Sequence, residues 1–300
     1  MNFKLVLAHL AMFAVSFIYA ANFTLVKIAM PEYIAPLGFI LLRACAGATL
    51  FWISSLVIRE KVPLKDIGML AFCGLFGVAI NQMMFFKGLE LTTPINGALI
   101  MLTAPILVLV FSIIALQEKL TVWKVGGIVL GLSGAALLIV SKSGISSADA
   151  PNPMLGNLFV GINAASYGIY LILIKPYTQK YHPITILKWV FGFGLLYVFP
   201  FGIGQVQAID WATIPTMVWW VIAFVLFCVT FLAYLLNAAA LTMVQPSVVS
   251  AYIYLQPLLA AIIAVAMGRD SINLELLAAG LLIFVGVFFV SMKKRTENVS

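Results

Sequence analysis

The sequence contains very little charge for its length. Only 9% of its 300 residues are Asp, Glu, Lys or Arg, whereas 64% are hydrophobic. Soluble globular domains carry about a quarter charged residues, and disordered chains carry few hydrophobic ones, so both classes are excluded. The net charge of +7 does not indicate nucleic-acid binding, because most Lys and Arg residues flank apolar segments instead of gathering on one polar face.

Residues that usually carry metal, redox or hydrolytic chemistry are also scarce. Cys45, Cys73 and Cys228 each lie singly within an apolar segment, and there is no CxxC motif, which argues against a disulfide framework or a zinc site. No HExxH motif or phosphate-binding loop occurs. We therefore expect no cofactor, no metal and no enzymatic activity. The alternative, a membrane-embedded enzyme, would need a buried base, nucleophile or metal set.

The sequence does contain long apolar segments. A helix of about 20 apolar residues crosses a hydrocarbon core about 30 Å thick. Ten segments are long enough: 5–30, 34–58, 67–87, 95–116, 122–140, 154–174, 184–204, 216–239, 248–267 and 274–292. They do not alternate between apolar and polar residues, as membrane-barrel strands do. The sequence therefore predicts an all-α membrane protein with ten transmembrane helices and short loops, so that any site lies within the membrane part.

Basic residues predict the orientation. With a cytoplasmic N-terminus, the basic residues at inside ends and loops are Lys4, Arg59, Lys61, Lys65, Lys119, Lys124, Lys175, Lys180, Lys188, Lys293, Lys294 and Arg295. Those at outside ends are Lys27, Lys87, Lys142 and Arg269. This excess agrees with the positive-inside rule. We expect a multi-pass protein of a bacterial-type inner membrane with both termini in the cytoplasm.

The two halves of the chain share a spacing. Pro94, Pro105, Glu118 and Gly134 are 11, 13 and 16 residues apart, and so are Pro246, Pro257, Asp270 and Gly286. Tyr19 in the first span similarly matches Tyr167 in the sixth. These matches predict two repeats, residues 1–144 and 151–295. Since each holds an odd number of spans, the second inserts upside down, and two inverted five-helix repeats are typical of secondary transporters with a substrate site between the repeats.

The stretches LTTPINGALIMLTAPILVLVFSIIALQEKLTVWKVGGIVLGLSG and PSVVSAYIYLQPLLAAIIAV, together with Arg43, resemble the EamA-type group of the drug/metabolite transporter superfamily. The resemblance covers nearly the whole chain and implies a ten-helix carrier whose central cavity exports small metabolites. The sequence departs from the pattern at 268–270, where Gly-Arg-Asp replaces the Gln-Glu of the first half, and at Tyr19–Ala20, where members often carry Trp-Gly. Amino-acid export, nucleobase or nucleoside export and broad drug efflux all remain open.

Arg43 lies nine residues past Ile34, which is about 13 Å along a helix and close to the centre of the bilayer. An arginine there costs roughly 2.5–3.5 kcal/mol on insertion scales, so it must face protein or water. One interpretation is a cationic anchor for a substrate carboxylate or carbonyl. The other is a structural arginine that is hydrogen-bonded to backbone carbonyls freed at a kinked helix.

Prolines and uncharged polar residues complete the predicted site. Pro105 and Pro257 each remove a backbone donor near mid-helix, so we expect a kink or hinge at both. Amides within hydrocarbon need partners and therefore face inward. The remaining predicted cavity residues are Tyr19, Asn22, Asn81, Gln82, Asn163, Tyr167, Tyr254 and Gln256. They favour a small amphipathic, amino-acid-like solute.

Two further expectations concern coupling and assembly. All ten acidic residues fall in loops or near span ends, so we expect no obligatory coupling to protons. Gly127 and Gly131 form a GxxxG motif, which packs helices closely either within one chain or between two. We expect a monomer in the lipid bilayer, with a dimer as the alternative, that moves its solute by alternating access.

Overall fold

The computed structural model describes residues 3–141, 151–266 and 274–292, apart from the side chains of a few helical residues. The repeat junction at 142–150, Asp270 and the basic residues at 293–295 therefore lie outside the described residues. Within the described ranges the regular structure is entirely helical. Ten helical stretches there are long and apolar enough to cross a membrane, which confirms the predicted number of spans.

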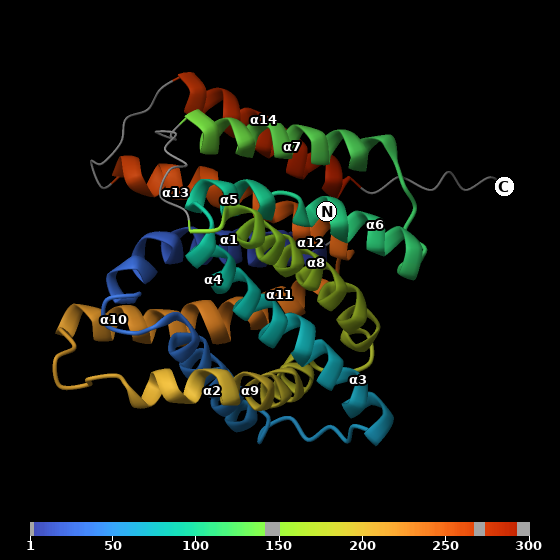
Figure 1. The fold of residues 1–300 in the computed structure, drawn as a ribbon. Helices are drawn as coiled ribbons and strands as arrows, with labels where there is room; N and C mark the ends of the chain where they lie inside the picture. Colours follow the sequence, from blue (N-terminus) through green and yellow to red (C-terminus); the bar gives the residue numbers. More distant parts are fainter. Residues whose placement is uncertain (1–2, 142–150, 267–273, 293–300) are drawn as a thin grey trace.

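The elements follow one order in both halves (Figure 1). The first half contains α1 (Phe3–Ala29), α2 (Pro36–Ser54), α3 (Leu64–Gly74), the π-helix η1 (Leu75–Ile80), α4 (Asn81–Leu91), α5 (Pro94–Met101), α6 (Ala104–Leu116) and α7 (Val122–Ser141). The second contains α8 (Pro153–Thr178), α9 (Pro183–Gln207), α10 (Thr216–Phe224), the π-helix η2 (Val225–Leu232), α11 (Ala233–Leu241), α12 (Pro246–Ala251), the 3₁₀ turn η3 (Tyr252–Tyr254), α13 (Leu255–Ala266) and α14 (Leu274–Ser291).

Local sequence explains where many spans begin. Proline occupies the first helical position of α2, α8, α9 and α12, where its missing N–H costs nothing and its fixed φ suits the helix. The side chain of Asn152 accepts a hydrogen bond from the backbone N–H of Leu155 and so caps α8. The prolines that begin α2 and α9 stand at equivalent places in the two halves, in keeping with a repeat.

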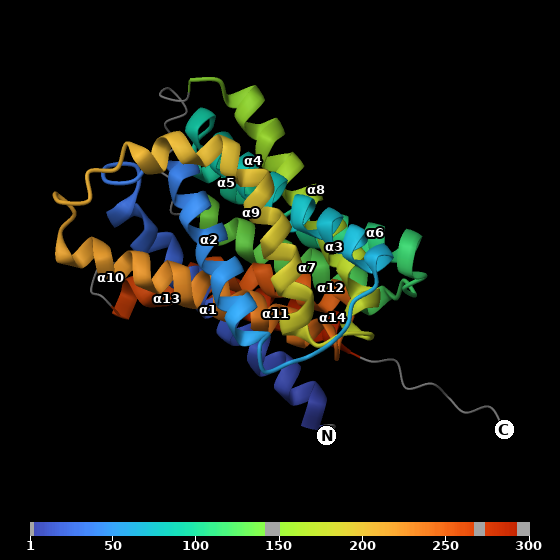
Figure 2. The ribbon, with the colours of Figure 1, turned by 90° about the horizontal axis from the view of Figure 1, so that it is seen from below.

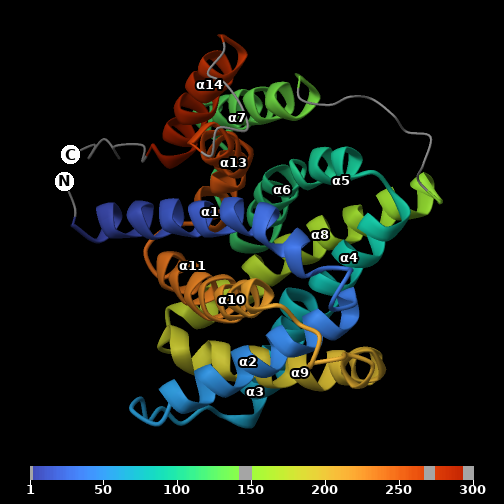
Figure 3. The same ribbon diagram turned by 90° about the vertical axis from the view of Figure 1, so that its left-hand side faces the viewer.

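The helices pack in pairs that the repeat relates. α7 packs along α14, and α2 packs along α9, so each of these pairs joins equivalent helices of the two halves. α1 packs on α11, and its equivalent α8 packs on α4. Figures 1 and 3 show the α7–α14 pair and the α2–α9 pair at opposite ends of the molecule, with α1, α8, α4 and α11 between them. The central layer is therefore built from both repeats.

The fourth and ninth spans are each interrupted a few residues before a proline. Two residues separate α5 from α6, and Pro105 is the second residue of α6. The 3₁₀ turn η3 separates α12 from α13, and Pro257 is the third residue of α13. A proline nitrogen cannot donate, and its ring clashes with the preceding turn. At the second break the hydroxyl of Ser16 donates to the carbonyl of Tyr252 at 3.0 Å, so α1 provides the hydrogen bond for this carbonyl.

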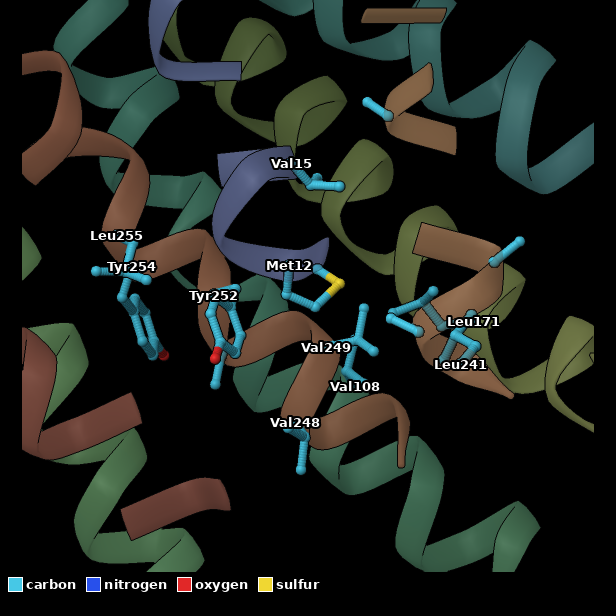
Figure 4. Packing of buried hydrophobic residues seen from close by; sticks show 14 of the residues in the cluster. Met12, Val15, Val108, Leu171, Leu241, Val248, Val249, Tyr252, Tyr254 and Leu255 are labelled. Atoms are coloured by element: carbon cyan, nitrogen blue, oxygen red, sulfur yellow. The ribbon is translucent and has the colours of Figure 1, made fainter. Parts of the chain in front are cut away.

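Packing around the second break is largely apolar. Figure 4 shows Met12 of α1 beside Tyr252 of η3, with Val249 of α12 and Val15 of α1 in the same apolar region. These residues belong to the largest buried cluster.

The third and eighth spans contain a feature that the sequence analysis missed. Each has a π-helix in its middle, η1 between α3 and α4 and η2 between α10 and α11. π-Helices are rare, and they often mark functional sites because their wider turns disturb the regular backbone hydrogen bonds. Their presence at equivalent places in both halves makes them part of the repeat.

The GxxxG motif of Gly127 and Gly131 lies at a contact between two helices of the same chain. A Cβ atom added to Gly127 would lie 2.5 Å from the carbonyl oxygen of Gly286 in α14, and one added to Gly286 would lie 2.6 Å from the carbonyl oxygen of Gly127. The glycines thus let the backbones of α7 and α14 approach closely. The structure assigns this motif to packing between the repeats.

Candidate functional site

The predicted membrane arginine lies where α2 meets η2. Arg43 is 8% exposed, and its Nε atom donates a hydrogen bond of 3.1 Å to the hydroxyl of Thr230. That hydroxyl in turn donates to the carbonyl of Val225 at 3.0 Å. No carboxylate of the described residues forms an ion pair with Arg43. The arginine therefore has one side-chain partner, on a π-helix of the other repeat, and no counter-ion among the described residues.

One tyrosine from each repeat lies near this arginine. Tyr19 of α1 and Tyr234 of α11 lie within electrostatic range of Arg43. Tyr19 is also within that range of Tyr167 on α8, its repeat equivalent. The structure thus brings together three predicted site residues and adds Tyr234. These side chains come from four helices, two in each half.

Tyr234 and Gln82 meet between the repeats. They are the second residues of α11 and α4, and the amide of Gln82 donates to the Tyr234 hydroxyl at 3.4 Å. The Tyr234 hydroxyl donates to the carbonyl of Gly77, within η1, at 3.2 Å. The Oε1 atom of Gln82 is buried without a hydrogen-bond partner. An uncharged acceptor thus lies close to the cluster.

Asn81 and Asn163 bind each other's backbone. The Asn163 amide donates to the Asn81 carbonyl at 2.6 Å, and the Asn81 amide donates to the Asn163 carbonyl at 3.3 Å. Ser166 donates to the carbonyl of Phe76 in η1 at 2.6 Å. These bonds tie α8 to the third span, so they give Asn81 and Asn163 a helix-joining role.

The remaining predicted residues are more dispersed. Asn22, in α1, has a buried Oδ1 atom without a hydrogen-bond partner. Tyr254 is fully buried, and a Cβ atom added to Gly131 of α7 would lie 2.4 Å from its ring. Gln256 is half-buried at the start of α13. The structure therefore directs Tyr254 toward α7 and does not group it with Arg43.

Two carboxylates are buried at span ends. Glu118, just after α6, accepts a hydrogen bond from Lys124 at 2.6 Å and another from the hydroxyl of Ser247. Its Oε2 atom is buried without a partner. Asp66, near the start of α3, accepts hydrogen bonds from Lys180 and Tyr181. These links join the two halves on the side that the basic residues predict to be cytoplasmic.

Hydrogen bonding to Asp66 affects the titration of its partners. It is the main cause that raises the pKa of Lys180, whose ammonium group is stabilised by the carboxylate. The same carboxylate raises the pKa of Tyr181, because an ionised phenol could not donate to it. Lys180 thus stays charged, which keeps this link between the repeats intact at neutral pH.

A lysine anchors the end of α8. The Nζ atom of Lys175 donates to the carbonyls of Leu241 and Val244, the latter at 2.8 Å, and so ties the end of α8 to the turn between α11 and α12. α8 packs against both of these helices. Within the described residues, α1 makes no comparable contact with α4 or α5. The side chain of Lys27, the repeat equivalent of Lys175, lies outside the described residues.

The comparisons with known proteins agree on one protein family. The sequence profile of the EamA-like transporter family matches residues 6–140 and again 154–292. An uncharacterized transporter of Archaeoglobus fulgidus is 24% identical over 95% of this chain and 98% of its own length. The uncharacterized transporter YoaV of Bacillus subtilis is 25% identical over 93% of this chain and 94% of its own.

One solved crystal structure has the same fold. It superposes with a TM-score of 0.77 and covers 94% of this chain and 95% of that chain. The two sequences are 18% identical, so this likeness concerns the fold alone.

Proposed function

Because the chain belongs to the EamA-like transporter family, we propose that it carries small metabolites, amino-acid-like or otherwise amphipathic, outward across the inner membrane by alternating access. In this proposal the repeats at 1–144 and 151–295 act as two inverted units of a monomer with both termini in the cytoplasm. The solute binds between them, near mid-membrane.

Arg43 is the observation that carries the proposal. A buried guanidinium with no carboxylate partner among the described residues is costly unless a ligand supplies negative charge. Tyr19 and Tyr234 provide aromatic surface and hydroxyl groups close by, and Tyr167 lies near both of them. Such a site suits a carboxylate-bearing solute of modest size, and it disfavours organic cations.

The packing of the helix ends supports alternating access. The end of α8 is tied to the α11–α12 turn, whereas α1 has no backbone contact of similar extent with α4 or α5 within the described residues. With the N-terminus inside, this conformation is closed toward the cytoplasm. In the transport step the end of α8 is released and the end of α1 takes up the packed arrangement, so that the carrier opens toward the other side. The interrupted fourth and ninth spans, with Pro105 and Pro257, serve as the hinges.

A solute screen in proteoliposomes tests the proposal. Radiolabelled amino acids, other small carboxylates and nucleosides would be offered to wild-type protein and to Arg43→Ala. We expect carboxylate solutes to be transported by the wild type and transport to fall at least ten-fold in the variant, while the variant remains inserted and monodisperse. Nucleoside transport that does not depend on Arg43 would favour the alternative of a nucleoside or drug carrier.

Two outcomes would change the proposal in a defined way. If Arg43→Ala reduced the amount of folded protein but left normal activity per folded molecule, Arg43 would be structural. We also expect counterflow of the solute to survive an uncoupler. If transport collapsed when the proton gradient was removed at a fixed solute gradient, the buried Glu118 would become the first candidate for a coupling site.

A further inference from the structure

We propose that Thr230 is a positioning residue that holds Arg43 so that its two terminal amino groups, and not Nε, receive the substrate anion. The substrate class is then a solute with a carboxylate that approaches the guanidinium end-on. This inference rests on the proposed function, because it takes Arg43 as the substrate-binding cation.

The geometry of the guanidinium carries the first step. Arginine has five N–H donors in a fixed plane, one on Nε and four on the terminal nitrogens. A carboxylate can be bound bidentately by both terminal nitrogens or by Nε and one terminal nitrogen. Here Nε already donates to Thr230 at 3.1 Å. The end-on arrangement is the bidentate one that remains available.

The π-helix fixes the acceptor. Thr230 is fully buried, and its single hydroxyl hydrogen is donated to the carbonyl of Val225, five residues earlier. The lone pairs of the hydroxyl are thus left for Nε of Arg43. A hydrogen bond to a charged group is stronger than one between neutral groups, so this contact holds the guanidinium in one orientation.

The repeat shows that the fold does not require this pair. Arg43 is seven residues past the proline that begins α2, and Val190 is seven residues past the proline that begins α9. Thr230 lies three residues before α11, and Val78 lies three residues before α4. Both valines are fully buried. The same two-helix interface thus forms from apolar residues, which argues that the polar pair serves binding.

The test uses chemical modification of Arg43, so no substrate needs to be known. Purified protein in nanodiscs is treated with phenylglyoxal, which reacts with guanidinium groups, and modification of the Arg43 peptide is followed by mass spectrometry. Acetate and acetamide are the matched probes, because they differ in charge and hardly in size. We expect acetate, and not acetamide, to protect Arg43 in the wild type and in Thr230→Ser.

Thr230→Val removes the hydroxyl at nearly constant volume. We expect roughly ten-fold more acetate to be needed for half-protection than in Thr230→Ser, since one charge-assisted hydrogen bond no longer orients the guanidinium. If Thr230→Val does not fold, Thr230→Ala replaces it in this test, because it removes the same hydroxyl and has a smaller side chain.

The two hypotheses fail differently. If acetate protects Arg43 equally in the wild type and in Thr230→Val, Thr230 does not position the arginine, while the proposed anion site stands. If acetate does not protect Arg43 in the wild type, the anion site itself is wrong, and the positioning role falls with it.

Discussion

Two interfaces of this transporter occupy equivalent places in the repeats and differ in chemistry. Where α2 meets η2, Arg43 binds Thr230. Where α9 meets η1, Val190 and Val78 stand at the corresponding positions, and both are fully buried. The same arrangement of helices therefore supports a charged contact in one half and an apolar one in the other. The repeat determines the shape of the carrier, and single residue differences between its halves create the polar contact.

The size of the residue just before each π-helix differs between the α2–η2 and α9–η1 interfaces. This residue is Gly74 before η1 and Phe224 before η2. A Cβ atom added to Gly74 would lie 2.6 Å from the carbonyl oxygen of Val190 and 3.1 Å from the nitrogen of Gly194. The backbones of α9 and the third span thus approach so closely that no side chain fits between them. A long side chain such as arginine needs the other interface, where no glycine brings the backbones together in this way.

The largest effect is expected when an arginine is placed in the α9–η1 interface instead of the α2–η2 interface. Val190→Arg puts a guanidinium into the apolar interface, where it has neither space nor a partner. Burial of an unpaired arginine at the membrane centre costs roughly 2.5–3.5 kcal/mol even on insertion scales. We expect most of the folded protein to be lost, as measured by size-exclusion chromatography of a fluorescent fusion.

Controls separate charge from volume in this experiment. Val190→Met adds length without charge and should retain much of the folded protein. Val190→Arg combined with Val78→Thr offers the arginine the partner that Arg43 has, and it should recover part of the loss. A Val190→Arg variant with a normal yield would show that the two interfaces are interchangeable.

Gly74→Ala should have the next largest effect. The new methyl group would meet backbone atoms of α9, which cannot move as a side chain can, and overpacking of this kind costs about 1–3 kcal/mol. Thermal unfolding in detergent measures the loss. Gly68→Ala in the same helix is the matched control, because nothing lies within 4 Å of its added Cβ. Equal unfolding temperatures for the two variants would contradict the close contact.

A second comparison concerns the equivalent ends of α8 and α1. Lys175 ties the end of α8 to the α11–α12 turn, and the side chain of its equivalent Lys27 lies outside the described residues. Lys175→Met removes the two hydrogen bonds to the carbonyls of Leu241 and Val244. Each charge-assisted bond contributes about 1.5–3 kcal/mol, so we expect the closed arrangement to lose at least ten-fold in relative population. Spin labels on Gln179 and Met243 should then report longer distances.

Lys188→Met is the control for this change, because Lys188 lies over the ring of Trp52, away from the α11–α12 turn. It should leave the label distances unaltered. If Lys175→Met did not alter the distances either, the tie at the end of α8 would be a static feature of the fold.

Much of the architecture follows from the sequence, and the reasons are local. Apolar length gives the ten spans, spacing gives the repeat, and Pro105 and Pro257 mark the interruptions. The π-helices are not evident, since the stretches LFGVAI and VLFCVTFL contain no residue that distinguishes a π-turn from an α-turn. Arg43 could be identified because a charge within an apolar segment is costly wherever it points.

The contacts of the predicted site residues could not be predicted from the sequence, and the reason is physical. Thr230 contacts Arg43 across 187 positions of sequence, and a threonine in an apolar helix is not unusual. The polar amides could be assigned to the interior but not to particular partners. Asn81 and Asn163 bind each other's backbone, and Tyr254 packs on α7. Which inward-facing side chain reaches which neighbour depends on helix rotation, which the apolar pattern fixes only loosely.

Val78→Thr alone should have the smallest effect. It tests directly whether the α9–η1 interface tolerates a polar group. It introduces into η1 the hydroxyl that η2 already has, without an arginine to bind. The new hydroxyl can donate to a carbonyl on the preceding turn of its own helix, as threonines in membrane helices do, so the free energy of unfolding should change by less than about 1 kcal/mol. Thermal unfolding and transport should both stay close to wild type. A large loss would mean that the interface at α9 rejects any polar group, and the partial rescue of Val190→Arg by the same threonine would then be ruled out as well.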